Sequence, residues 1–126
     1  MKPKQVLSVE QMKHLQELGL DTSDGSMCFE WNESNADNMV VTSPDADTNY
    51  DYYHETYTLQ DILGKLPCFI DTYVLTLQQL ASTGTCLYME PYSRSILILK
   101  EDKKLIDAAY EMLCWCIENK YIEKEK

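Results

Sequence analysis

The chain lacks basic residues over a long internal stretch: residues 14–64, which we call the acidic window, contain no lysine and no arginine. The same window contains eleven aspartates and glutamates, whereas the rest of the chain has ten acids and eleven bases. The window therefore carries all of the excess acid behind the net charge of −10. Because such a surface repels phosphates and anionic headgroups, we expect neither direct nucleic-acid binding nor membrane binding.

Long apolar runs, glycine-rich loops and paired cysteine motifs are also missing. No run approaches the roughly 18–20 apolar residues of a membrane span, and residues 1–5 lack the apolar segment of a signal peptide. The four glycines are scattered, so no phosphate-binding loop and no cofactor is predicted. The odd number of cysteines and their spacing argue against a disulfide framework or a zinc site. We interpret them as reduced thiols in a cytoplasmic protein: Cys28, Cys68, Cys86, Cys114 and Cys116.

Two short helices are predicted from their ends. Ser8 and Gln11 form a capping box before a helix over residues 9–18, and Gly19 is typical of its left-handed stop. Thr58 and Asp61 form a second capping box, before a helix that ends at proline 67.

The most apolar helix is predicted over residues 103–118. Asp102 is its expected N-cap, and apolar residues recur at helical spacing over much of its circumference. Asn119 is expected in the left-handed conformation at its end. A helix of this kind packs deeply against a sheet.

Alternating apolar residues predict a hairpin followed, after the second helix, by a three-stranded meander. Residues 43–56 have no clear period and are predicted as an acidic surface loop. The fold class is α+β: a mostly antiparallel sheet with about three helices on one face, in one domain over residues 1–126, in the order α-β-β-α-β-β-β-α. The predicted strands are residues 26–31, 39–42, 73–79, 85–90 and 95–100.

A metal site is weighed and not predicted. Asp45, Asp47 and Asp51 have the spacing at which a calcium-binding EF-hand loop begins. Tyr50, however, stands where that loop requires glycine, and Thr56 stands where it requires a bidentate glutamate. A solvated acidic loop is the better interpretation.

A catalytic site is also not predicted. His14 and His54 are the two histidines. His14 is expected on the first helix beside its apolar stripe, as a surface residue or one between the buried and the exposed face. Cys28 or Cys68 could meet His54 in space, but no nucleophile motif accompanies them. An enzyme with an unrecognised site around His54 is kept as an alternative.

The leading hypothesis is a non-enzymatic binding or accessory protein. It contacts a protein partner, for which a basic protein is a candidate, through an acidic, tyrosine-rich surface. Tyrosine offers a large contact area with few rotatable bonds and a polar tip. A homo-oligomer is compatible with this hypothesis, and an acidic nucleic-acid mimic that inhibits a DNA-binding protein is a second alternative. The candidate binding residues are Asp45, Asp47, Asp51, Tyr50, Tyr52, Tyr53 and His54.

Three stretches resemble small uncharacterised proteins of gut bacteria that are associated with phages and other mobile elements. The stretches are residues 8–21 (SVEQMKHLQELGLD), 57–67 (YTLQDILGKLP) and 105–119 (LIDAAYEMLCWCIEN). The resemblance implies a bacterial cytoplasmic setting. It assigns no activity, so no functional residue is carried over.

Overall fold

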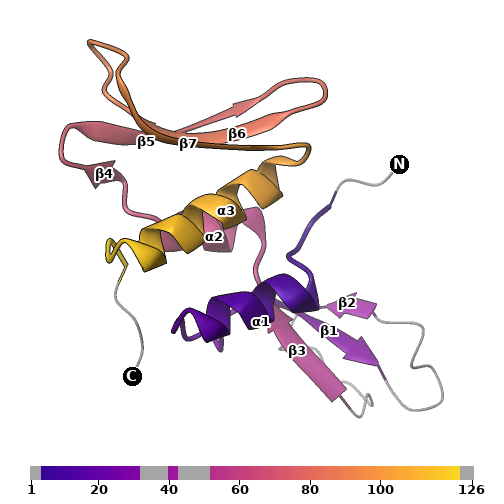
Figure 1. Cartoon of the computed structure of the whole chain (residues 1–126). Helices are drawn as coiled ribbons and strands as arrows, with labels where there is room; N and C mark the ends of the chain where they lie inside the picture. The colour runs from indigo at the N-terminus through magenta and orange to yellow at the C-terminus, as the bar shows by residue number, and fades with distance from the viewer. Residues whose placement is uncertain (1–3, 32–39, 43–51, 123–126) are drawn as a thin grey trace.

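The computed structural model describes the backbone of residues 4–31, 40–42 and 52–122, and the side chains of residues 4–28 and 55–122 (Figure 1). The fold is α+β, as predicted, with three helices and two antiparallel sheets in the described part of the chain. The elements are α1 (Val9–Glu17), β1 (Met27–Trp31), β2 (Val40–Thr42), β3 (Tyr52–Thr56), α2 (Leu59–Lys65), β4 (Phe69–Ile70), β5 (Tyr73–Gln79), β6 (Gly84–Met89), β7 (Ile96–Asp102) and α3 (Leu105–Glu118).

The small sheet has the strand order β2-β1-β3, and the large sheet has the order β4-β5-β6-β7. The predicted hairpin is the pair β1–β2, and the predicted meander is β5–β6–β7, so both are confirmed. Two strands, β3 and β4, were not predicted. The single sheet of the prediction is therefore replaced by two.

The predicted loop over residues 43–56 is wrong at its end, because Tyr52–Thr56 form β3. This strand pairs with β1 over five residues, from Met27 opposite Thr56 to Trp31 opposite Tyr52. A long-range partner supplies its backbone hydrogen bonds, which explains why local alternation gave no signal. Residues 43–51 lie outside the described residues.

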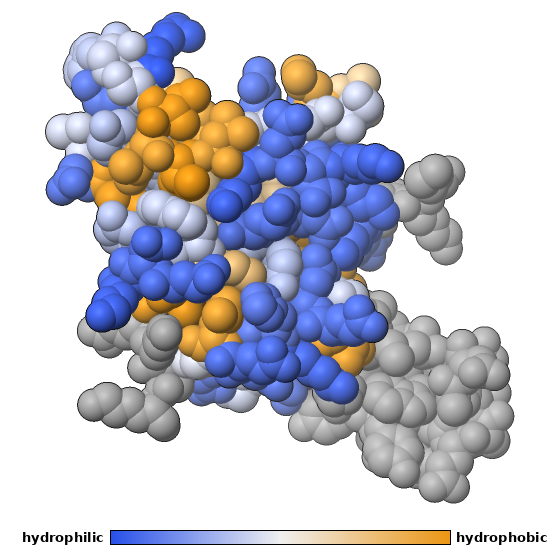
Figure 2. Space-filling view, viewed as in Figure 1, coloured by the Kyte–Doolittle hydropathy of each residue, from blue (hydrophilic) through white to orange (hydrophobic). Residues whose placement is uncertain are grey.

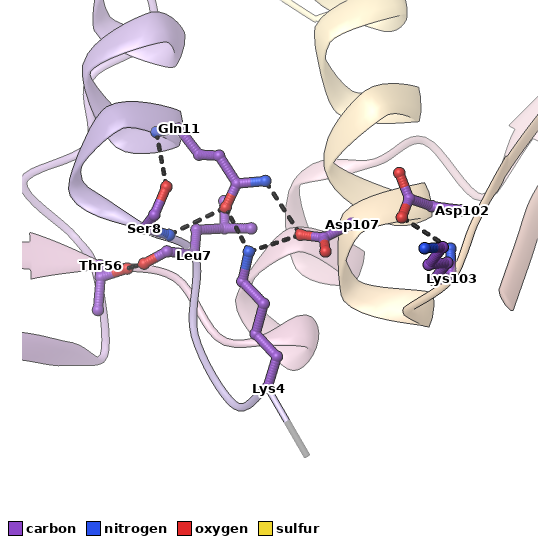
Figure 3. Close-up of polar contacts among 8 residues, drawn as sticks. All are labelled: Lys4, Leu7, Ser8, Gln11, Thr56, Asp102, Lys103 and Asp107. Carbon is purple, nitrogen blue, oxygen red and sulfur yellow. Dashed lines mark hydrogen bonds and ion pairs between the residues drawn. The ribbon is translucent and has the colours of Figure 1, made fainter. Parts of the chain in front are cut away.

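The predicted ends of α1 and α2 are confirmed. Ser8 Oγ accepts a hydrogen bond from the Gln11 amide at 3.1 Å, and Gln11 Oε1 accepts one from the Ser8 amide at 2.9 Å (Figure 3). Gly19 has a φ of 100°, the left-handed conformation that closes α1. Thr58 and Asp61 form the same reciprocal pair at α2.

The predicted N-cap of α3 is wrong. Asp102 is the last residue of β7, and the helix begins three residues later behind Lys104, whose side chain makes no capping hydrogen bond. Asp102 stays in the strand because β7 pairs along its length with β6, ending at Gly84. A Cβ on Gly84 would lie 2.4 Å from the Leu105 Cα, so glycine lets the start of α3 approach the sheet.

The C-terminal end of α3 also differs from the prediction. Asn119 has a φ of −99°, and Lys120, with a φ of 66°, takes the left-handed position instead. The last helical residue is Glu118, as predicted, and the difference lies in the cap: the Asn119 amide still donates to the carbonyl of Trp115 at 3.0 Å, so the left-handed residue comes one position later.

The hydrophobic core centres on α3, which lies between the large sheet and α1 (Figure 1). α3 packs on β6 and β7 along one side and on α2 along another. Its buried residues belong to one cluster with residues of α1, α2 and the large sheet. They are Ile106, Ala108, Ala109, Met112, Leu113, Cys114, Cys116 and Ile117.

A polar junction ties the N-terminal segment and α1 to α3 (Figure 3). Asp107 Oδ1 accepts from Lys4 Nζ at 2.7 Å and from Gln11 Nε2 at 3.0 Å. Lys4 Nζ also donates to Gln11 Oε1 at 2.8 Å. Asp107 is partly desolvated here, yet the hydrogen bonds and the charge of Lys4 hold the pKa of its carboxyl below its usual range. The junction therefore fixes α1 against α3.

We predict that Leu113→Ala destabilises the domain by about 2–5 kcal/mol, because it leaves a cavity under the most buried helix. The measurement is the free energy of unfolding from denaturant titration. Leu80→Ala is the matched control, since Leu80 is 56% exposed in the β5–β6 turn and its truncation should change little. Equal losses for the two variants would contradict the described register of α3.

Candidate interaction surface

The residues predicted to bind a partner are described only in part. Asp45, Asp47, Tyr50 and Asp51 lie outside the described residues. Tyr52, Tyr53 and His54 lie in β3, an edge strand of the small sheet. Because successive residues of a strand alternate between faces, residues 52 and 54 belong to one face and residue 53 to the other. The side chains of these three residues lie outside the described ones.

The pairing of β1 with β3 separates the elements of a Cys–His site. Cys28 stands opposite Glu55, and Phe29 stands opposite His54, so Cys28 and His54 belong to opposite faces of the small sheet. Cys68 immediately precedes β4, a strand of the large sheet. Within the described part of the chain, no three His, Cys, Asp or Glu side chains are grouped to hold a metal ion.

The thiols of the large sheet and α3 are poorly suited to nucleophilic chemistry. Burial raises the pKa of Cys86 to about 12, and that of Cys114 and of Cys116 to about 11. A thiolate is the reactive form, so these three side chains act as small apolar core residues. Cys68 is exposed and carries a free thiol.

One face of the large sheet packs on the helices. Residues directly opposite one another in antiparallel strands share a face, so cross-strand pairs define it. In its two central rows all members but Lys100 lie in the core or against it, whereas the end row Gln79–Gly84–Asp102 does not. The central rows are Leu75–Tyr88–Ile98 and Leu77–Cys86–Lys100.

The opposite face of the large sheet, the outer face, also carries apolar residues. Its middle is closed, because Leu87 on β6 is 6% exposed although it lies outside the core cluster. Figure 2 shows apolar surface over the end of the large sheet near β4 and the β6–β7 turn. The rows on this face are Phe69–Val74–Met89–Ile96 and Thr76–Leu87–Leu99.

The exposed apolar residues of this sheet lie on its two edge strands. We call Phe69, Ile96, Leu97 and Leu99 the sheet patch. A register shift explains why β7 contributes so much: Tyr88 pairs with Ile98 and Met89 pairs with Ile96, which leaves Leu97 as an extra residue. The exposed fractions are 65% for Phe69, 50% for Ile96, 38% for Leu97 and 41% for Leu99.

A structured turn borders the sheet patch. The Glu90 carboxylate accepts hydrogen bonds from the amides of Tyr92 at 2.9 Å and Ser93 at 3.3 Å, which also lower the pKa of Glu90. This turn leaves Tyr92 98% exposed. Tyrosine at the rim of an apolar patch is a typical contact residue of protein interfaces.

Sequence reasoning missed the sheet patch. The available signal was the unbroken run Ile96–Leu99, because a strand with one solvated face is expected to alternate apolar and polar residues. Four consecutive apolar residues in a strand place apolar side chains on both faces of the sheet, so one of them needs a second covering layer or stays exposed.

The described parts of the acidic window include the small sheet, which lies on the other side of α3 from the large sheet, and most of α2, which packs on α3 (Figure 1). The described acids of this window are partly neutralised locally. Asp24 pairs with Lys65 and accepts a hydrogen bond from the Tyr57 hydroxyl at 2.8 Å. Asp61 accepts from the hydroxyl of Ser26 at 2.6 Å.

One carboxylate oxygen of α3 receives no hydrogen bond from the described part of the chain. Glu111 Oε2 is buried and accepts no hydrogen bond there. Burial raises the pKa of the Glu111 carboxyl, and a hydrogen bond with Asp102 and the negative charge of Asp102 raise this pKa further. The positive charge of Lys100 lowers it, and the negative charge of Asp107 adds a smaller increase. Two carboxylates cannot share a hydrogen bond without a proton, so Glu111 is held toward its neutral form.

We predict that Glu111→Gln raises the melting temperature at pH 7 and changes it little near pH 4. The folded pKa of Glu111 lies above the unfolded value of about 4.3. The stability that its neutral form contributes is therefore complete below the unfolded pKa and is lost as pH rises through the folded pKa. Glu118→Gln, an exposed change on the same helix, is the control. A difference between the two variants that does not depend on pH would contradict this assignment.

Among the described residues, no helix is long and apolar enough to cross a membrane. Comparison of the chain with protein-family models, with curated proteins and with solved structures finds no match. The sheet patch and the acidic window are therefore interpreted from their own residues.

Proposed function

We propose that this chain is a non-enzymatic interaction protein that binds another polypeptide through the outer face of its large sheet. The observation that carries the proposal is the sheet patch: four large apolar side chains are exposed on a sheet whose other face is packed on α3. Exposed apolar groups of this kind mark protein contacts in soluble domains. The exposed Tyr92 at the border adds a contact residue.

The chemistry of the described side chains supports binding rather than catalysis. Three cysteines are buried with raised pKa values. His14 contacts Tyr110 at a ring distance of 6.4 Å and lies 3.8 Å from the Glu17 carboxylate on the surface of α1. The enzyme alternative around His54 has no described catalytic partner to support it.

The acidic window supports a second contact, with a basic protein. The small sheet, whose strands belong to this window, lies apart from the large sheet that carries the sheet patch, so one chain can present both surfaces at once. The tyrosine-rich segment that contains Asp45, Asp47 and Asp51 belongs to this second proposal, as does the nucleic-acid mimic. The bacterial, cytoplasmic and mobile-element setting stays a prediction from resemblance.

The sheet patch is tested by photo-crosslinking in the native host. A photoreactive phenylalanine analogue replaces Phe69, and in a control chain it replaces Leu80, which is 56% exposed in the β5–β6 turn. Both sites tolerate a large aromatic group because both are open to solvent. We expect protein adducts from position 69 and few from position 80. Equal adduct yields at the two positions would remove the support for the patch.

The acidic window is tested with the triple variant Asp45→Asn, Asp47→Asn, Asp51→Asn. If the window steers a basic partner, the association rate constant should fall, and the fall should shrink as salt shortens the Debye length to about 8 Å. Surface plasmon resonance at two salt concentrations measures this. A loss of a calcium-dependent rise in melting temperature in the same variant would instead indicate a cation site.

A further inference from the structure

We propose that the first polypeptide on the large sheet is a second copy of this chain, whose β7 pairs antiparallel with β7 of the first copy around Ile98. The inference rests on the proposed function and names its partner. Two four-stranded sheets would then form one continuous eight-stranded sheet. The contact is isologous, with a two-fold axis through the seam.

The backbone of β7 provides the free edge. The strand has seven residues and, among the described residues, pairs only with β6. Natural edge strands are usually kept short or interrupted, because their unpaired amides and carbonyls template further strands. The other edge of the same sheet follows this rule, since β4 has two residues. β7 is longer and begins with four apolar residues, Ile96–Leu99. The register shift at Leu97 interrupts its start, but Ile98–Asp102 pair regularly with β6 and, in the described part of the chain, leave their other side unpaired.

The side chains of β7 select one register. A two-fold axis perpendicular to the sheet requires that one residue stands opposite itself. Centred on Ile98, the register sets Leu97 of each copy opposite Leu99 of the other, and the exposed parts of the two sheet patches meet. Centred on Lys100 or Glu101, it would set like charges directly opposite each other.

The ends of the strand agree with this register. With Ile98 at the centre, Ser95 of one copy stands opposite Glu101 of the other. This register leaves one apolar residue of each strand opposite a charge, since Ile96 stands opposite Lys100. Centred on Leu99 instead, the register would set three apolar residues of each strand, Ile96, Leu97 and Ile98, opposite charged ones.

The charge distribution favours self-association at this face over any other. Residues 65–126, which contain the large sheet and α3, have nine acids and eight bases. The small sheet, whose strands belong to the acidic window, lies on the far side of α3 from the large sheet (Figure 1). Two copies joined through β7 therefore meet through their nearly neutral halves and keep their acidic halves apart.

Sedimentation equilibrium tests the dimer. We expect the wild-type chain to dimerise, and Leu97→Lys with Leu99→Lys to raise the dimer Kd about tenfold or more, because four like charges then meet at the seam. Leu80→Lys, an equally polar change in the β5–β6 turn and outside the sheet patch, should leave the Kd unchanged. Thermal melts show that each variant is folded, as expected for exposed positions.

Cross-linking tests the register. Leu97→Cys mixed with Leu99→Cys, both in a Cys68→Ser background, should form mixed disulfides faster than either variant alone. A wild-type chain that stays monomeric overturns the inference, as does a dimer that β7 substitutions leave intact. Neither result changes the photo-crosslinks expected from position 69. The proposed function fails only if position 69 gives no more protein adducts than position 80.

Discussion

The packing of α3 against the large sheet is the interaction on which the rest of the structure depends. Leu113, Met112 and Ile117 are fully buried, and they belong to one cluster with residues of α1, α2 and the large sheet. Burial of each such side chain contributes about 1.5–3 kcal/mol. On its other side the helix holds α1 through Asp107. The two halves of the molecule are thus placed relative to one helix.

This arrangement leaves the large sheet with one covered and one open face. α3 and α2 supply apolar cover from one side only, and the rows that contain Phe69, Ile96 and Leu99 face away from it. Neighbouring side chains close over Leu87 in the middle, whereas the edge strands have a neighbour on one side and stay open. Exposure at the edges follows from the topology rather than from an excess of apolar residues. The proposed contacts lie where the fold itself stops covering the sheet.

Local signals predicted the elements whose ends are stabilised by neighbouring residues. The capping boxes of Ser8 and Thr58 and the stop at Gly19 were correct because each involves groups within a few residues of one another. The strands of the meander were correct for the same reason, since short turns join them. The error at Asp102 has the opposite cause, because pairing with Gly84 in another strand extends β7. At Asn119 the helix ends as predicted after Glu118, and only the left-handed conformation falls on Lys120 instead.

The sequence by itself determined the α+β class, the charge of the acidic window and the depth of the last helix, because composition, capping and periodicity are properties of neighbouring residues. Only the tertiary structure decided that β3 joins β1, that the strands form two sheets, and that one edge of the large sheet is short while the other is long. Those outcomes depend on pairing between segments far apart in the chain. The sheet patch is of this second kind, because the run Ile96–Leu99 becomes a surface only when one face of β7 has been covered by α3.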